Sequence, residues 1–153
     1  MAVDSIFAIA NIVAVIVWLA LFGVLLLGPS RWRRLHRTVD LAASIIVPCL
    51  YALVYIVLMA TSWGEVEGGF GSLAELLPLY ASPGLVVAGW LHYLAIDMFV
   101  GAWQLRETAR HGLPRLLVLP CMVLTFLLGP VGLLLFLILR TVFCRRVALG
   151  QVA

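Results

Sequence analysis

The residues best suited to chemistry lie together in the third apolar stretch of this sequence. His92, Tyr93 and Asp97 fall within a segment, about 84–105, that is otherwise rich in aliphatic and aromatic side chains. A charged group in hydrocarbon costs about 2.5 to 3.5 kcal/mol on insertion scales and is a functional-site candidate by default. Asp97 is therefore the leading candidate for acid–base chemistry, and packing against a neighbouring helix is its alternative role.

Helical geometry indicates which of these side chains can act together. At roughly 100° per residue, the side chains within about 40° of Asp97 are Trp90, Tyr93, Gly101 and Gln104. We expect this stripe to face the interior of a helix bundle. His92 points roughly 140° away from Asp97, on the side of Phe99. On a straight helix His92 and Asp97 cannot touch, so they can serve one ligand only if other helices complete the pocket.

Composition indicates that membrane-spanning helices carry these residues. The chain has 153 residues, of which 65% are hydrophobic and 11% charged, and its mean hydropathy is +1.17. Soluble domains are roughly half apolar and a quarter charged. Each helix that crosses a bilayer uses about 20 apolar residues. The sequence therefore predicts an all-α fold, a single polytopic membrane domain with four transmembrane helices in a small bundle.

The four predicted spans are about 6–27, 41–60, 84–105 and 116–139. The first loop carries four arginines, Arg31, Arg33, Arg34 and Arg37, which places it in the cytoplasm by the positive-inside rule. We expect a bacterial cytoplasmic (inner) membrane protein. Four spans would put the C-terminal arginines on the opposite side, so a re-entrant last segment is the alternative. Within the last span, Gly129-Pro130 predicts a kink.

The charge pattern bears on partners and cofactors. All ten basic residues are arginines and the net charge is +3. They form short clusters between apolar spans, which argues against nucleic acid and favours lipid headgroups of the bilayer. One His and one carboxylate within the spans are too few for a metal or haem site. We therefore expect no metal and no cofactor. The residues do not decide between a monomer and a homo-oligomer.

Several other polar or aromatic residues within the spans are candidates for contact with a ligand. Tyr51 and Tyr55 share a helical face with Ser44 and Pro48, and this face should point at other helices. Thr125 lies near small residues that favour close helix packing. The full set of candidate binding residues is Asn11, Tyr51, Tyr55, Trp90, Tyr93, Phe99 and Thr125.

Two motifs carry a resemblance to a known family. The run GWLHYLAIDMFVG at 89–101, followed by GPVGLL at 129–134, resembles the abscisic-acid-deficient-four-like (neoxanthin synthase-like) membrane protein family. The plant members of this family are tied to neoxanthin synthesis. The resemblance covers nearly the whole chain. The family pattern has an arginine where this chain has Ala102, and Arg106, one turn further on, is the candidate substitute.

The resemblance implies a cofactor-free isomerisation of a carotenoid or isoprenoid end group. In this reaction an epoxide opens as a proton leaves the polyene, which gives an allene. An acid is needed at the epoxide oxygen and a base at the departing proton. His92 and Asp97 are the implied catalytic pair, in either order of roles, and Tyr93 or Asn11 would orient the oxygen. The alternatives are a non-catalytic protein that binds pigments or organises partner enzymes, and a structural subunit.

Overall fold

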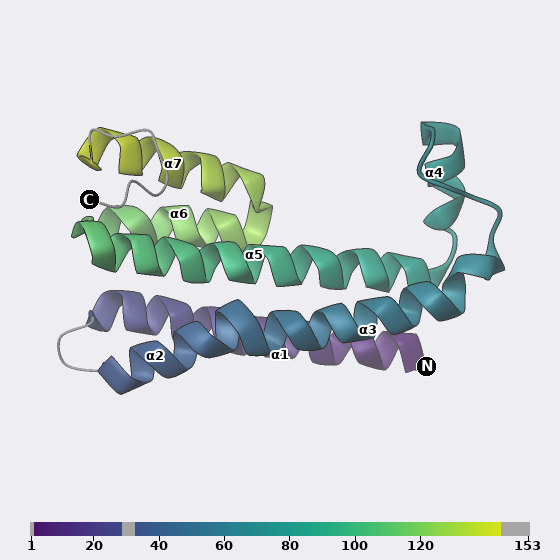
Figure 1. Cartoon of the computed structure of the whole chain (residues 1–153), viewed down its shortest axis with the longest axis horizontal. Helices are drawn as coiled ribbons and strands as arrows, with labels where there is room; N and C mark the ends of the chain where they lie inside the picture. Colours follow the sequence, from purple (N-terminus) through teal and green to yellow (C-terminus); the bar gives the residue numbers. More distant parts are fainter. Residues whose placement is uncertain (1, 29–32, 145–153) are drawn as a thin grey trace.

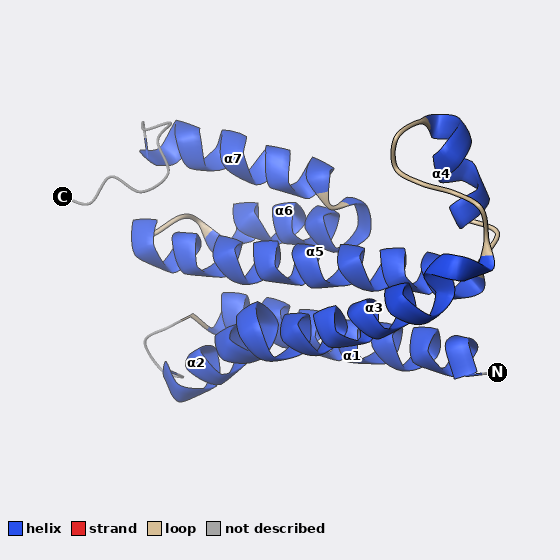
Figure 2. Cartoon of the chain, turned by 45° about the vertical axis from the view of Figure 1, so that its right-hand side comes forward, coloured by secondary structure: helices blue, strands red, loops and turns tan. Residues whose placement is uncertain are grey.

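A computed structural model describes residues 2–28 and 33–144, and every regular element in these ranges is helical (Figures 1 and 2). The elements in chain order are α1 (Ala2–Leu27), α2 (Arg33–Leu41), a π-helical segment (Ala42–Ile46), α3 (Val47–Ser62), a 3₁₀ turn (Trp63–Glu65), α4 (Leu73–Leu79), α5 (Pro83–His111), α6 (Arg115–Leu128) and α7 (Pro130–Cys144). The predicted all-α fold is confirmed.

Within the described residues, three helical stretches are long and apolar enough to cross a membrane. They are Ala2–Leu27, Arg33–Ser62 and Pro83–His111, and they contain the predicted spans 6–27, 41–60 and 84–105. The stretches lie side by side in Figure 1. α5 is the central helix, because it packs against α1, α3, α6 and α7.

The predicted fourth span, 116–139, is not confirmed. This segment forms two helices, α6 with 14 residues and α7 with 15, and they lie against each other as a hairpin (Figure 2). A helix of 15 residues is about 22 Å long, which is shorter than the roughly 30 Å of bilayer hydrocarbon. The described residues therefore contain three candidate spans and a helical hairpin, and a fourth span is not confirmed.

The chain reverses at Gly129-Pro130, where a kink was the leading prediction and a re-entrant segment the alternative. Gly129 has φ +37°, in a region that side chains other than glycine rarely adopt. Pro130 cannot donate a backbone hydrogen bond and disfavours helical geometry in the preceding residue. Beyond the turn, Gly132 packs directly against the backbone of Cys121 and Thr125, where a Cβ atom would collide. The small residue therefore allows α6 and α7 to approach closely.

The hairpin brings the arginines of distant segments to one end of the bundle. The arginines in the described residues are Arg33, Arg34, Arg37, Arg106, Arg110, Arg115 and Arg140. By the helix bounds they lie in α2, toward the ends of α5 and α7, and at the start of α6, and these helix ends lie at the same end of the bundle (Figure 1). Arg31, Arg145 and Arg146 lie outside the described residues. A continuous fourth span would have separated these charges, whereas a hairpin returns the chain to the same end.

A buried ion pair holds the second arm of the hairpin to α5. Nε of Arg140 donates to Oε2 of Glu107 at 2.7 Å, and the exposed fractions of these residues are only 4% and 8%. Nε2 of His111 lies 3.2 Å from the same carboxylate oxygen. Because a buried charge without a partner is strongly unfavourable, this contact fixes the position of α7.

A π-helical segment precedes α3, the helix whose tyrosines contact α1 and α5. Pro48 lacks the N–H that would bond to the carbonyl of Ser44, and the helix is widened over Ala42–Ile46. The Tyr51 hydroxyl donates to the carbonyl of Ala10 in α1 at 2.7 Å. The Tyr55 ring lies 6.2 Å from the imidazole of His92 in α5. The tyrosines of this face therefore point at other helices, as predicted.

Candidate functional site

Asp97 lies in the middle of α5, facing the turn of the hairpin. It is 8% exposed, and its Oδ2 atom is buried without a hydrogen-bond partner among the described residues. Gly129, in the turn of the hairpin, lies against the carboxyl group, because a Cβ atom on Gly129 would be 2.8 Å from Oδ1 of Asp97. A buried polar atom normally has a partner, so the carboxyl group retains capacity for a further hydrogen bond.

A row of polar and aromatic side chains leads from Asp97 toward α1. Tyr93 lies one helical turn before Asp97 on the same face of α5, so its hydroxyl is close to the Asp97 carboxyl group. The Tyr93 ring stacks on Trp90 with 5.4 Å between centroids, and Nε1 of Trp90 donates to Oδ1 of Asn11 at 3.1 Å. Trp90, Tyr93 and Asp97 therefore lie along one face of α5, as their helical spacing predicted, and the fold brings Asn11 of α1 against Trp90.

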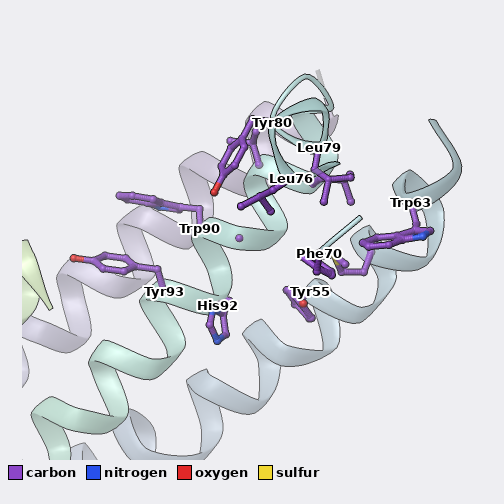
Figure 3. Close-up of a pocket in the computed structure, with 13 residues that line it drawn as sticks. Tyr55, Trp63, Phe70, Leu76, Leu79, Tyr80, Trp90, His92 and Tyr93 are labelled. Atoms are coloured by element: carbon purple, nitrogen blue, oxygen red, sulfur yellow. The ribbon is translucent and has the colours of Figure 1, made fainter. Parts of the chain in front are cut away.

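Two hollows border this row. The larger, here called the aromatic groove, has a volume of about 610 Å³ and lies between α3, α4 and α5; Figure 3 shows its lining. Its aromatic lining, apart from His92, consists of Tyr55, Trp63, Phe70, Tyr80, Trp90 and Tyr93. The smaller hollow, about 180 Å³, lies between α1, α5 and α6 and is lined in part by Asn11 and Phe126. Trp90 and Tyr93 line both hollows.

His92 belongs to the aromatic groove and does not meet Asp97. Its side chain is exposed and lies beside Tyr55 at one edge of the groove (Figure 3). Asp97 lines neither of the two hollows. The two implied catalytic residues therefore do not form a touching pair, which agrees with their angular separation on the helix. Tyr93 lies between them, because it lines the groove with His92 and is one helical turn before Asp97 on the same face of α5.

Three other candidate residues lie outside this site. Thr125 is fully buried, accepts a hydrogen bond from Nε2 of Gln104 at 2.8 Å and donates to the carbonyl of Cys121 at 2.9 Å. Phe99 lies beneath the guanidinium group of Arg106, 5.9 Å from ring centroid to Cζ. Neither residue lines either hollow, and neither does Tyr51.

Arg106 does not take the place of an arginine at position 102. Ala102 is fully buried, whereas Nη1 of Arg106 forms an ion pair with Oδ1 of Asp40 at 2.6 Å. Arg106 is nine residues after Asp97, which puts the two on opposite faces of α5 at roughly 100° per residue. The cation therefore joins α5 to α2 and leaves the Asp97 carboxyl without an arginine from α5.

Two tertiary contacts of α5 were not predicted from the sequence. The first is the approach of Gly129 to Asp97, residues that are far apart in the chain. The second is the ion pair between Glu107 and Arg140. The Gly-Pro pair was the available signal for the first contact, but that pair fits a kink and a reversal equally well. For the second contact, the apolar sequence around Arg140 was a weak sign that the charge needs a buried partner.

Fold and site together define a small helical bundle that presents helices able to span a membrane and a buried carboxyl group at the turn of a hairpin. The model of the ABA DEFICIENT 4-like family matches residues 5–136, which include every residue of the Asp97 row and the hairpin turn. The chain therefore belongs to the ABA DEFICIENT 4-like family. No curated protein and no solved structure matches it.

Proposed function

We propose that this protein binds the end group of a carotenoid or related isoprenoid in the aromatic groove and isomerises it without a cofactor. The observation that carries the proposal is the position of Tyr93, which lines the groove and lies one helical turn from the buried Asp97 on the same face of α5. Membership of the ABA DEFICIENT 4-like family also supports a role in carotenoid or isoprenoid chemistry.

The groove suits a flat, conjugated and apolar ligand. Its walls come from α3 and α5, and residues of α4 and of the preceding loop close one end (Figure 3). Aromatic rings stack well on conjugated systems and offer few polar groups that would have to lose water. A volume of about 610 Å³ falls within the range of small-molecule sites. The end group would enter the aromatic groove, and the rest of the polyene would lie outside it along α3 and α5.

The reaction requires one proton to leave carbon and one to reach oxygen. We assign the first transfer to His92, which would take the proton from the polyene carbon next to the epoxide. The electrons of that C–H bond form the new double bond as the epoxide C–O bond breaks. Tyr93 would protonate the released oxygen and recover its proton from a protonated Asp97. Return of a proton from His92 to Asp97 resets the site, so the isomerisation consumes no proton and needs no redox partner.

Expression in a host that makes epoxy-carotenoids tests this proposal, with chromatography of the extracted pigments. The wild-type chain should accumulate an allenic product. Asp97→Asn, Tyr93→Phe and His92→Gln should each lower its formation at least about 100-fold, the typical scale of acid–base catalysis. Tyr51→Phe is the matched control, because the Tyr51 hydroxyl is bound to Ala10 outside the groove. A folded, membrane-inserted wild-type chain that leaves the pigments unchanged would contradict the reaction.

A second candidate function is pigment binding without catalysis. It is favoured by the separation of His92 from Asp97, which leaves the implied acid and base on different sides of α5. In that case pigment would co-purify unconverted, and Asp97→Asn would retain it. Retention of pigment by the wild-type chain together with loss on Trp90→Ala would then identify the aromatic groove as a binding surface.

We also propose that the arginine-rich end faces the cytoplasm. Support comes from the seven described arginines at one end of the bundle, because positive charge marks the cytoplasmic side of membrane proteins. The N-terminus and α4 would then lie on the other side. A bacterial cytoplasmic membrane remains the setting that we propose for this arrangement.

A further inference from the structure

A third hollow lies at the arginine-rich end, separate from the aromatic groove. It has a volume of about 140 Å³ and is formed between α1, α2 and the turn that joins α5 to α6. Its polar lining comes from His36, Thr108 and Arg115, and its apolar lining includes Leu25 and Leu105. The hollow therefore combines two basic side chains and a threonine with apolar side chains.

The basic groups of this hollow lack partners within the described residues. The Nε2 atom of His36 is buried and makes no hydrogen bond there, an arrangement that is unfavourable for a ring nitrogen. Arg115 forms no ion pair with any residue that the structure describes. Two hydrogen-bonding groups thus face one small space, and neither has a partner in the described chain.

The position of Arg115 depends on a glycine. Its guanidinium group lies directly against Gly28, so that a Cβ atom at that position would overlap it. Gly28 also has φ +75°, a conformation that glycine adopts without strain. The end of α1 therefore holds Arg115 beside the hollow. The backbone N–H groups at the start of α6, which begins at Arg115, add the positive end of a helix dipole.

None of the described residues that line this hollow is acidic. The two acidic residues nearest in sequence to its lining are engaged elsewhere. Asp40 pairs with Arg106 at 2.6 Å, and Glu107 pairs with Arg140 at 2.7 Å. The positive charge at the hollow is therefore not neutralised by its own lining.

We propose that this hollow binds a phosphate group, either the headgroup of an anionic phospholipid or free phosphate. The arginine guanidinium group matches phosphate oxygens with two parallel hydrogen bonds, and His36 supplies a further ring N–H. Basic pockets between membrane helices are known to hold anionic headgroups. The space admits a phosphate but not an acyl chain, which would lie outside along α1 and α6.

The competing role for Arg115 is to neutralise the carbonyl end of α1. Under that role, Arg115→Gln lowers stability by the same amount with or without an anion. Under the proposal, the variant loses the response to the anion. The two roles therefore predict different changes in stability on adding an anion to Arg115→Gln, which a titration measures.

Thermal unfolding of the full chain in uncharged detergent, stripped of lipid, tests the proposal. Phosphatidylglycerol, phosphatidylcholine and inorganic phosphate would be titrated separately. We expect phosphatidylglycerol or phosphate to raise the Tm of the wild-type chain, and phosphatidylcholine to have much less effect. Arg115→Gln and His36→Ala should weaken the apparent affinity about tenfold, the equivalent of roughly one charge-assisted hydrogen bond. Arg37→Gln removes the same charge from an exposed residue outside the hollow and should retain the apparent affinity of the wild-type chain.

Stabilisation by phosphate alone identifies the free anion as the ligand, and stabilisation by phosphatidylglycerol alone identifies the headgroup. Equal losses for Arg115→Gln and Arg37→Gln, or a wild-type Tm that neither anion changes, would overturn the proposal. If Arg115→Gln does not fold, Arg115→Lys takes its place. This variant keeps the charge and loses the paired geometry, so unchanged affinity for it would also count against the site. None of these measurements depends on pigment chemistry.

Discussion

Gly129 in the hairpin turn lies directly against the carboxyl group of Asp97 in the central helix. A Cβ atom on Gly129 would lie 2.8 Å and 3.0 Å from the two carboxylate oxygens of Asp97. The glycine also holds φ +37°. The turn can therefore sit over the carboxyl group only because residue 129 has no side chain, and the same contact covers Asp97 from the hairpin side.

Gly129→Ala should destabilise the protein by about 1–3 kcal/mol, since it adds backbone strain to a steric contact with Asp97. Thermal unfolding in detergent measures the change. Gly23→Ala is the matched control, because no heavy atom lies within 4 Å of a Cβ at that position in α1, and it should be neutral or slightly stabilising. Combining Gly129→Ala with Asp97→Ala should recover part of the loss. A Gly129→Ala protein as stable as wild type would show that the turn adapts.

Arg140→Met should destabilise the protein by about 3–5 kcal/mol, because it leaves the buried Glu107 carboxylate without its closest partner. Replacing both residues, with Glu107→Leu and Arg140→Met together, should restore much of the stability, as apolar groups need no counter-charge. The free energies of unfolding of the two single variants and the double variant measure the coupling. Strictly additive effects would mean that the ion pair does not hold α7 to α5.

Tyr51→Phe should lower stability by about 1 kcal/mol, the usual net value of one hydrogen bond. The reason is loss of the buried contact with the carbonyl of Ala10. Pigment binding should not change. Tyr55→Phe is the informative comparison, because Tyr55 lines the aromatic groove and should alter pigment binding with little effect on unfolding. Loss of pigment binding by Tyr51→Phe without loss of stability would contradict this prediction and identify Tyr51 as a ligand contact.

Side-specific labelling tests the hairpin. Each variant would carry a single cysteine, with the remaining native cysteines replaced by alanine. Cys144, at the end of α7, should react with a membrane-impermeant thiol reagent from the same side of the membrane as Thr38→Cys in α2. Glu67→Cys, in the loop before α4, should react from the opposite side. A continuous fourth crossing would give the reverse pairing, with Cys144 and Glu67→Cys labelled together, and would therefore contradict the hairpin.

Local pattern was sufficient for much of this protein. Hydropathy located the segments 6–27, 41–60 and 84–105, because the free energy of moving a segment into hydrocarbon is summed over its own residues. Helical periodicity placed Tyr93 and Asp97 on one stripe and separated them from His92. Both properties depend on residues close together in the chain, so they can be read without knowledge of the fold.

The contacts that complete the site depend on residues distant in the chain. Tyr51 and Ala10 are 41 residues apart, and Arg140 and Glu107 are 33 apart. Hydropathy over 116–139 is the same whether this segment crosses once or folds back, so it could not distinguish a span from a hairpin. The hairpin follows instead from the backbone conformation at Gly129 and from the packing of α6 and α7 with α5. Tertiary packing thereby covered Asp97 with a backbone turn and brought Arg140 back to Glu107.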